Sequence, residues 1–80
     1  MAASLSRDMH EAHFGRARAY AAIGGFEGCR DELRTAIKIE PNDVEYHELL
    51  AVCLASLGEK EEADREGQRA RELDRSDRKQ

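Results

Sequence analysis

The chain repeats itself with a 34-residue period, and this period constrains its fold more than any other feature of the sequence. Periods in this range are typical of small units that stack on their neighbours. We therefore predict one domain, residues 1–80, built from two copies of one unit, residues 10–43 and residues 44–77. The shift by one period aligns Ala17 with Ala51, Ala36 with Ala70, Gly24 with Gly58, His13 with His47 and Ile23 with Leu57.

The first copy carries the signals of two helices joined by a glycine turn. Apolar and small residues recur at helical spacing after Met9. Gly24 and Gly25 are expected to end this helix, because glycine adopts the left-handed conformation of a helix C-terminus without strain. A second apolar stripe is expected to end at Glu40, since Pro41 disfavours helical geometry in the residue before it.

The second copy repeats this pattern. Asn42 and Asp43 can cap the third helix, and Gly58 is expected to end it. The fourth helix is then expected over residues 60–74, with acidic residues in its first turn that suit the helix dipole. The remaining residues, 1–8 and 76–80, are predicted to be flexible ends.

Composition agrees with an all-α chain that has no membrane segment. One proline and two phenylalanines in 80 residues argue against a sandwich or barrel of strands. No apolar run approaches the roughly 20 residues that cross a membrane, and the N-terminus has no hydrophobic block of signal-peptide length. The expected compartment is therefore the cytoplasm.

The spacing and several individual residues resemble the tetratricopeptide repeat, a helix–turn–helix unit with the same period. The resemblance covers nearly the whole chain and implies an all-α fold in which two such repeats form a short right-handed α-solenoid of four helices. The matching residues are Tyr20, Ala36 and Pro41 in the first repeat and Leu50, Ala63 and Ala70 in the second. The departures are His13 and His47 for a large aromatic residue, Arg16 for a leucine, Gly67 for the second aromatic residue and Arg75 for the proline.

The last helix is predicted to be a polar cap. In a stacked array the second helix of each unit offers an apolar face to the next unit, as Leu33 and Ile37 do in the first repeat. The equivalent positions of the second repeat are Gly67 and Arg71. A third repeat could bury little there, because burying unpaired charge is costly. We therefore expect the array to end with its second repeat.

The residues that could carry chemistry are few. Cys29 and Cys53 are too few for a disulfide framework and are expected to be small hydrophobic core residues. His10 and His13 lie one helical turn apart, but no third strong metal ligand accompanies them. Nothing orients Cys53 with His47 as a nucleophile and its base. We therefore expect no metal, no cofactor and no enzymatic activity.

Nucleic acid is also not an expected partner. The C-terminal tail carries six Arg and Lys residues from Arg65 onward, but five acidic residues alternate with them from Asp64 onward. Such alternation is typical of a solvated helix face rather than of a phosphate-binding patch.

The resemblance implies a binding face instead. In tetratricopeptide repeat proteins the first helices of successive units line a concave surface that takes helices or peptides. Here this surface would present an apolar strip edged by charges, and such rimmed patches often mark contact sites. An amphipathic helix or extended peptide with basic flanks would fit it. The predicted partner-binding residues are Glu11, Phe14, Arg18, Glu45, Glu48, Leu49 and Val52.

Two alternatives remain open at this point. Phe14 and Leu49 could simply pack on the N-terminal segment or across a dimer. The chain could also be a structural self-association unit, a homodimer through its open repeat faces, with the Arg16 side of the first helix as one such face. The charged-tail binding of one chaperone-binding subgroup is not expected, because Phe14, Arg18 and Leu49 replace its lysine, asparagine and arginine.

Overall fold

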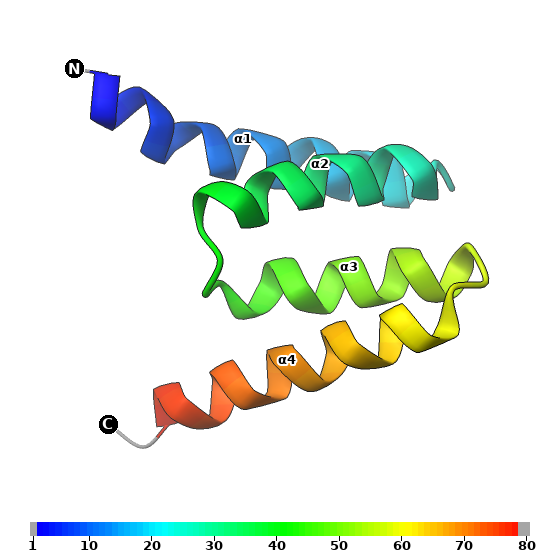
Figure 1. Cartoon of the computed structure of the whole chain (residues 1–80). Coiled ribbons are helices and arrows are strands. Elements are labelled where there is room, and N and C mark those ends of the chain that lie inside the picture. The colour runs from blue at the N-terminus through cyan, green and yellow to red at the C-terminus, as the bar shows by residue number, and fades with distance from the viewer. Residues whose placement is uncertain (1, 79–80) are drawn as a thin grey trace.

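The chain folds into four α-helices joined by short turns. The computed structural model describes residues 2–78, with side chains over residues 9–75. No strand occurs in this part of the chain, so the all-α prediction is confirmed. The helices are α1 (Ala2–Ala22), α2 (Phe26–Ile39), α3 (Val44–Ser56) and α4 (Lys60–Arg78), shown in Figure 1.

The glycine turns end α1 and α3 in the same way. Gly24 and Gly58 have φ angles of 80° and 87°, in the left-handed region that glycine enters without steric cost. The residue after each glycine donates its backbone N–H to a carbonyl in the last helical turn. These bonds run from Gly25 to Tyr20 (2.8 Å) and from Glu59 to Leu54 (2.9 Å), positions that again differ by one period. Both predicted helix ends are confirmed.

The connection between α2 and α3 also follows the sequence. α2 ends at Ile39, and the N–H of Glu40 donates to the carbonyl of Ala36 at 2.8 Å. The Asp43 carboxylate accepts hydrogen bonds from the N–H groups of Glu45 (3.0 Å) and Tyr46 (3.3 Å). This side-chain cap satisfies donors that have no partner inside the helix.

The helical backbone extends further at both ends than the apolar pattern predicts. Residues 2–8 and 76–78, which the sequence assigned to flexible ends, continue α1 and α4. The alanines at the start of α1 have the highest intrinsic helix propensity, which favours this extension. The rest of that prediction, residues 1, 79 and 80, lies outside the described part of the chain.

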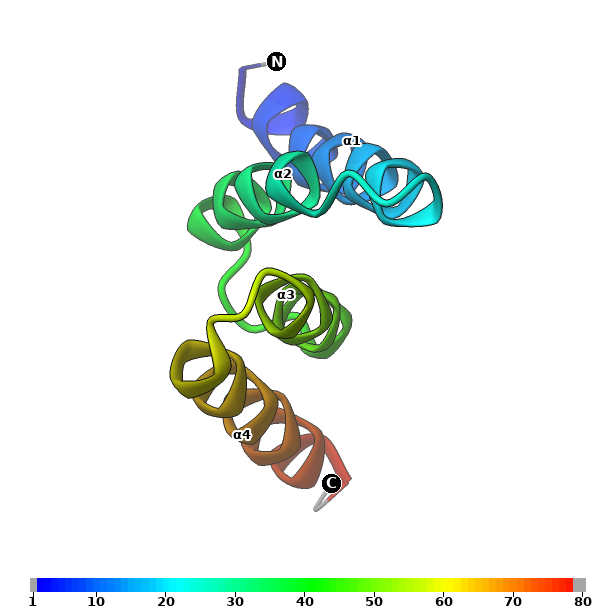
Figure 2. The same cartoon turned by 90° about the vertical axis from the view of Figure 1, so that its right-hand side faces the viewer.

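The helices pack as two antiparallel pairs, α1 with α2 and α3 with α4, and α2 lies between α1 and α3 (Figures 1 and 2). Their overall extents are 40 × 33 × 17 Å. Because one helix with side chains is about 10 Å across, the thin dimension leaves every helix partly uncovered. The core consists of Ala17, Cys29, Leu33, Ala36, Tyr46, Leu50, Cys53, Leu54 and Ala63.

A disulfide between Cys29 and Cys53 joins α2 to α3. The prediction that these cysteines are small core residues is right about their burial, since neither is exposed, and wrong about their chemistry. The two residues stand equally far from Pro41, twelve before it and twelve after it. Antiparallel packing around that turn therefore brings them to the same level, with 6.5 Å between their Cα atoms.

The disulfide bears on the expected compartment. Disulfides persist in oxidising environments and are rare in cytosolic proteins. The Cys29–Cys53 bond therefore argues against the cytoplasmic prediction. Over the described residues, no helix combines the length and the apolar character that a membrane span needs.

Candidate functional site

An open groove runs between α1 and α3 on one side of the molecule. Its volume is about 260 Å³. Glu11, the one predicted partner-binding residue outside this groove, is exposed on α1. The other six predicted residues line it: Phe14 and Arg18 from α1 and Glu45, Glu48, Leu49 and Val52 from α3.

The apolar part of the groove is partly accessible. Phe14 and Leu49 are half-buried against the core, while Val52 is 54% exposed. Phe14 and Leu49 thus pack on core residues and also line the groove. The alternative that they pack on the N-terminal segment lies outside the residues whose side chains are described. The side of each residue that faces away from the core remains open to a ligand.

Beneath the groove lies an aromatic contact that the sequence did not predict. The ring of Phe14 packs against the ring of Tyr46, with 4.8 Å between centroids. The hydroxyl of Tyr46 lies 2.5 Å from Nδ1 of His10. Tyr46 is only 2% exposed, so α1 and α3 are held together beneath the groove. The position of Tyr46, three residues after the Asp43 cap, did not predict this contact, because the contact depends on where α1 lies.

Burial and nearby acids disfavour ionisation of Tyr46. Desolvation is the largest cause and raises the pKa of Tyr46 to about 12, helped by the negative charges of Asp43 and Glu11. The phenol therefore stays neutral over the whole physiological range and remains available as a hydrogen-bond donor or acceptor to His10.

The two sides of the groove carry opposite charge. On the α3 side Glu45 and Glu48 are exposed. On the α1 side the guanidinium carbon of Arg18 lies 5.9 Å from the centre of the Phe14 ring, within the range of a cation–π contact. A ligand with basic residues on its α3 side would find complementary charge there.

A histidine–glutamate pair braces each hairpin beside this groove. Nδ1 of His13 lies 2.5 Å from Oε1 of Glu32, and Nδ1 of His47 lies 2.6 Å from Oε1 of Glu66. Both members of the second pair lie one repeat period after their counterparts in the first. Since the carbonyl of Pro41 can only accept, Nε2–H of His47 donates to it at 2.8 Å. Each of these histidines therefore links the two helices of its hairpin.

Over the described residues, no three His, Cys, Asp or Glu side chains gather where they could hold a metal ion. The cysteines are bonded to each other in the core and therefore present no free thiol.

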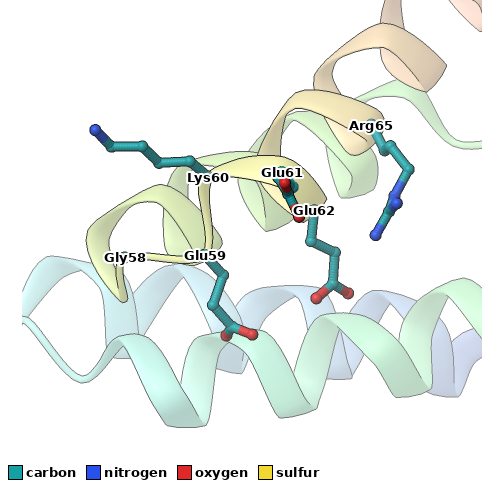
Figure 3. Close-up of a pocket in the computed structure, with 6 residues that line it drawn as sticks. All are labelled: Gly58, Glu59, Lys60, Glu61, Glu62 and Arg65. Atoms are coloured by element: carbon teal, nitrogen blue, oxygen red, sulfur yellow. The ribbon is translucent and has the colours of Figure 1, made fainter.

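A second hollow, of about 410 Å³, lies at the turn between α3 and α4 and is lined by charged residues (Figure 3). Glu59 and Glu62 point toward the neighbouring helix, whereas Lys60 points away (Figure 3). Glu62 accepts a hydrogen bond from Arg34 at 2.9 Å, and Glu59 lies 3.8 Å from Arg30. This hollow is thus the outer edge of a charged link between the two hairpins.

Comparison with known proteins identifies no family for this chain. No protein-family model, no curated protein and no solved structure matches it.

Proposed function

We propose that the chain is a short tetratricopeptide-type repeat protein that binds another protein through the groove between α1 and α3. Its ligand is an amphipathic helix or an extended peptide with basic flanks. The observation that carries this proposal is the groove itself, where Phe14, Leu49 and Val52 meet beside two exposed acids. The 34-residue period and the repeated helix turns support the repeat assignment.

The groove suits a ligand of modest affinity. Its apolar strip is short, and Glu45 and Glu48 are well solvated at its edge. Such rim charges act mainly on the rate of association and on the choice of partner. We expect spaced apolar anchors on the ligand to face Leu49 and Val52 and expect its Lys or Arg residues to lie over the two acids.

A displayed library of random 12–15-residue peptides tests this function without a named partner. Selection on the wild-type chain is expected to enrich peptides with apolar residues three or four apart and Lys or Arg beside them. Val52→Glu places a charge in the apolar strip and is expected to abolish the enrichment. The double change Glu45→Lys and Glu48→Lys is expected to replace the basic flanks by acidic ones.

Thr35→Glu is the matched control, because Thr35 is also a β-branched, exposed helix residue but lies on α2. Helicity by circular dichroism checks that every variant is folded. Peptides that bind wild type and Val52→Glu equally would overturn the proposal, as would a selection that enriches no apolar spacing.

A further inference from the structure

A third hollow lies on the other side of α1, away from the groove. It has a volume of about 270 Å³ and is lined by Arg16, Ala19, Tyr20 and Ile23, which we call the α1 outer face. At about 100° per residue these positions point away from Phe14 and Arg18. Tyr20 is 39% exposed, and Ile23, in the turn directly after α1, is 80% exposed.

The same face of the second hairpin is covered. Each residue of the α1 outer face has an equivalent in the second hairpin, one repeat period later. Leu50, Cys53 and Leu54 are buried and Leu57 is half-buried. The cover is α2, which lies against α3 and is bonded to it through Cys53. Over the described residues, no helix lies on α1 in the equivalent place.

The α1 outer face carries one charged residue that the equivalent, covered face of α3 lacks. Arg16 stands where α3 has Leu50. Its guanidinium is largely exposed and lies 3.8 Å from Oε1 of Glu32, an oxygen that already binds His13. A helix that covers this face must therefore bring a polar acceptor to Arg16 and apolar residues to Tyr20 and Ile23, because an unpaired buried charge is costly.

We propose that the α1 outer face binds an amphipathic helix of another protein, laid along α1 as α2 lies along α3, with one carboxylate of that helix on Arg16. Charge complementarity at Arg16 and the coverage of the equivalent α3 face carry this inference. It does not depend on the groove between α1 and α3.

A second copy of this chain is a poorer occupant. End-to-end stacking would use the outer face of α4, where Gly67 and Arg71 replace the Leu33 and Ile37 of α2. Gly67 offers no side chain to Tyr20 or Ile23, and Arg71 would add a second cation to the side that carries Arg16.

A segment of this chain can serve as the test ligand for the α1 outer face. A peptide with the sequence of residues 26–39 copies α2, the helix that covers the equivalent face, and carries Cys29→Ala to prevent disulfide exchange. Leu33 lies one turn from Cys29, and Leu50 lies one turn from Cys53. Leu33 and Leu50 both lie nearer than the cysteines to the turn that connects α2 and α3, because these two helices are antiparallel (Figure 1). Position 33 of the peptide therefore corresponds to the place of Arg16.

Two probe peptides follow from this register. The apolar probe keeps Leu33, and the acidic probe carries Leu33→Glu. Each is titrated into the isotopically labelled full chain, and binding is followed by the backbone amide shifts of residues 16–23. Because an exposed ion pair contributes modestly, we expect the acidic probe to bind wild type about threefold more tightly than the apolar probe. Arg16→Leu is expected to reverse this order.

Ile23→Glu is expected to weaken binding of the acidic probe about tenfold, because it places a like charge in the apolar part of the face. Gln68→Glu on α4 is exposed, adds the same charge elsewhere and is expected to change nothing.

Three results would overturn the proposal. The first is a lack of saturable shifts at residues 16–23 with either peptide. The second is a peptide preference that Arg16→Leu leaves unchanged. The third is a shift of the same amides on dilution of the protein alone, which would assign the face to a second copy. Since the groove test uses Val52 on the opposite side, the two proposals can fail separately.

Discussion

The two hairpins are built alike and covered differently. Each has the same glycine turn, and each has a His–Glu pair, with Nδ1–Oε1 distances of 2.5 and 2.6 Å. Yet Leu54 is fully buried, while Tyr20, its equivalent, is 39% exposed. The difference arises because α3 is packed against both α2 and α4, whereas α1 is packed chiefly against α2. An internal repeat thus predicts contacts within a unit better than it predicts what lies between units.

Truncation of Leu54 and of its equivalent, Tyr20, should reveal the largest difference between the two hairpins. Leu54→Ala removes a fully buried side chain and is expected to cost about 2–5 kcal/mol of the free energy of unfolding. Tyr20→Ala is expected to cost about 1 kcal/mol or less, since its ring is partly solvated. Urea denaturation followed by circular dichroism measures both. Equal costs would contradict the assignment of an uncovered face to α1.

The disulfide stabilises the face of α3, has no equivalent on α1, and can be broken by a reductant without any mutation. It joins cysteines with a sequence separation of 24, for which the chain-entropy model gives about 3 kcal/mol of stabilisation. Reduction by dithiothreitol should lower the urea midpoint of wild type accordingly. The double variant Cys29→Ala and Cys53→Ala, which has no thiol, serves as the control and should not respond to the reductant.

The two histidine pairs should differ in proportion to their burial. The His47 side chain is 7% exposed and bonds both Glu66 and Pro41, while that of His13 is 17% exposed and bonds Glu32. His47→Ala leaves two acceptors without a donor and is expected to cost about 2 kcal/mol, against about 1 kcal/mol for His13→Ala. Thermal unfolding at fixed pH compares them. A larger cost at His13 would contradict the idea that burial sets the cost of losing each pair.

Two of the helical glycines, Gly28 and Gly67, should respond unequally to alanine. A Cβ at Gly67 would meet nothing within 4 Å, so Gly67→Ala is expected to stabilise the chain by about 0.5–1 kcal/mol through helix propensity. A Cβ at Gly28 would lie 2.9 Å from the ring of Tyr20. Gly28→Ala must displace that ring and should gain less or lose stability. The difference in melting temperature measures how firmly Tyr20 rests on α2.

One further effect appears only in alkali. Because the pKa of Tyr46 is raised from 10.0 to about 12, the neutral phenol is favoured in the folded chain. Its contribution to stability is complete below about pH 10 and is lost as pH rises from about 10 to about 12. Tyr46→Phe should remove this part of the pH dependence. An absorbance titration of wild type in the near ultraviolet should show a tyrosine that ionises near pH 12.

Much of the fold followed from local rules. Gly24, Gly58, Pro41 and Asp43 act on the backbone within a few residues of themselves, so the ends of α1, α2 and α3 were predictable. The resemblance to the tetratricopeptide repeat also predicted that Phe14, Leu49 and Val52 share one face, because in such repeats the first helices of successive units line the same surface.

The rest required the packing of helices that are distant in sequence. Tyr46 was missed because its partners, His10 and Phe14, belong to another helix. The disulfide was missed because the equal spacing of the two cysteines from Pro41 brings them together only when α2 packs antiparallel on α3. The helical backbone of α1 and α4 also continues beyond the residues at which apolar periodicity stops.

The sequence by itself determined two helical hairpins and the turns that separate them, since backbone geometry responds to nearby residues. Tertiary structure decided which faces are covered. α2 buries Leu54, and a disulfide joins Cys29 of α2 to Cys53, whereas Tyr20 and Ile23 remain 39% and 80% exposed. Identical positions in a repeat therefore become core or surface according to their neighbours, because burial is a property of the contact between two helices and not of either helix alone.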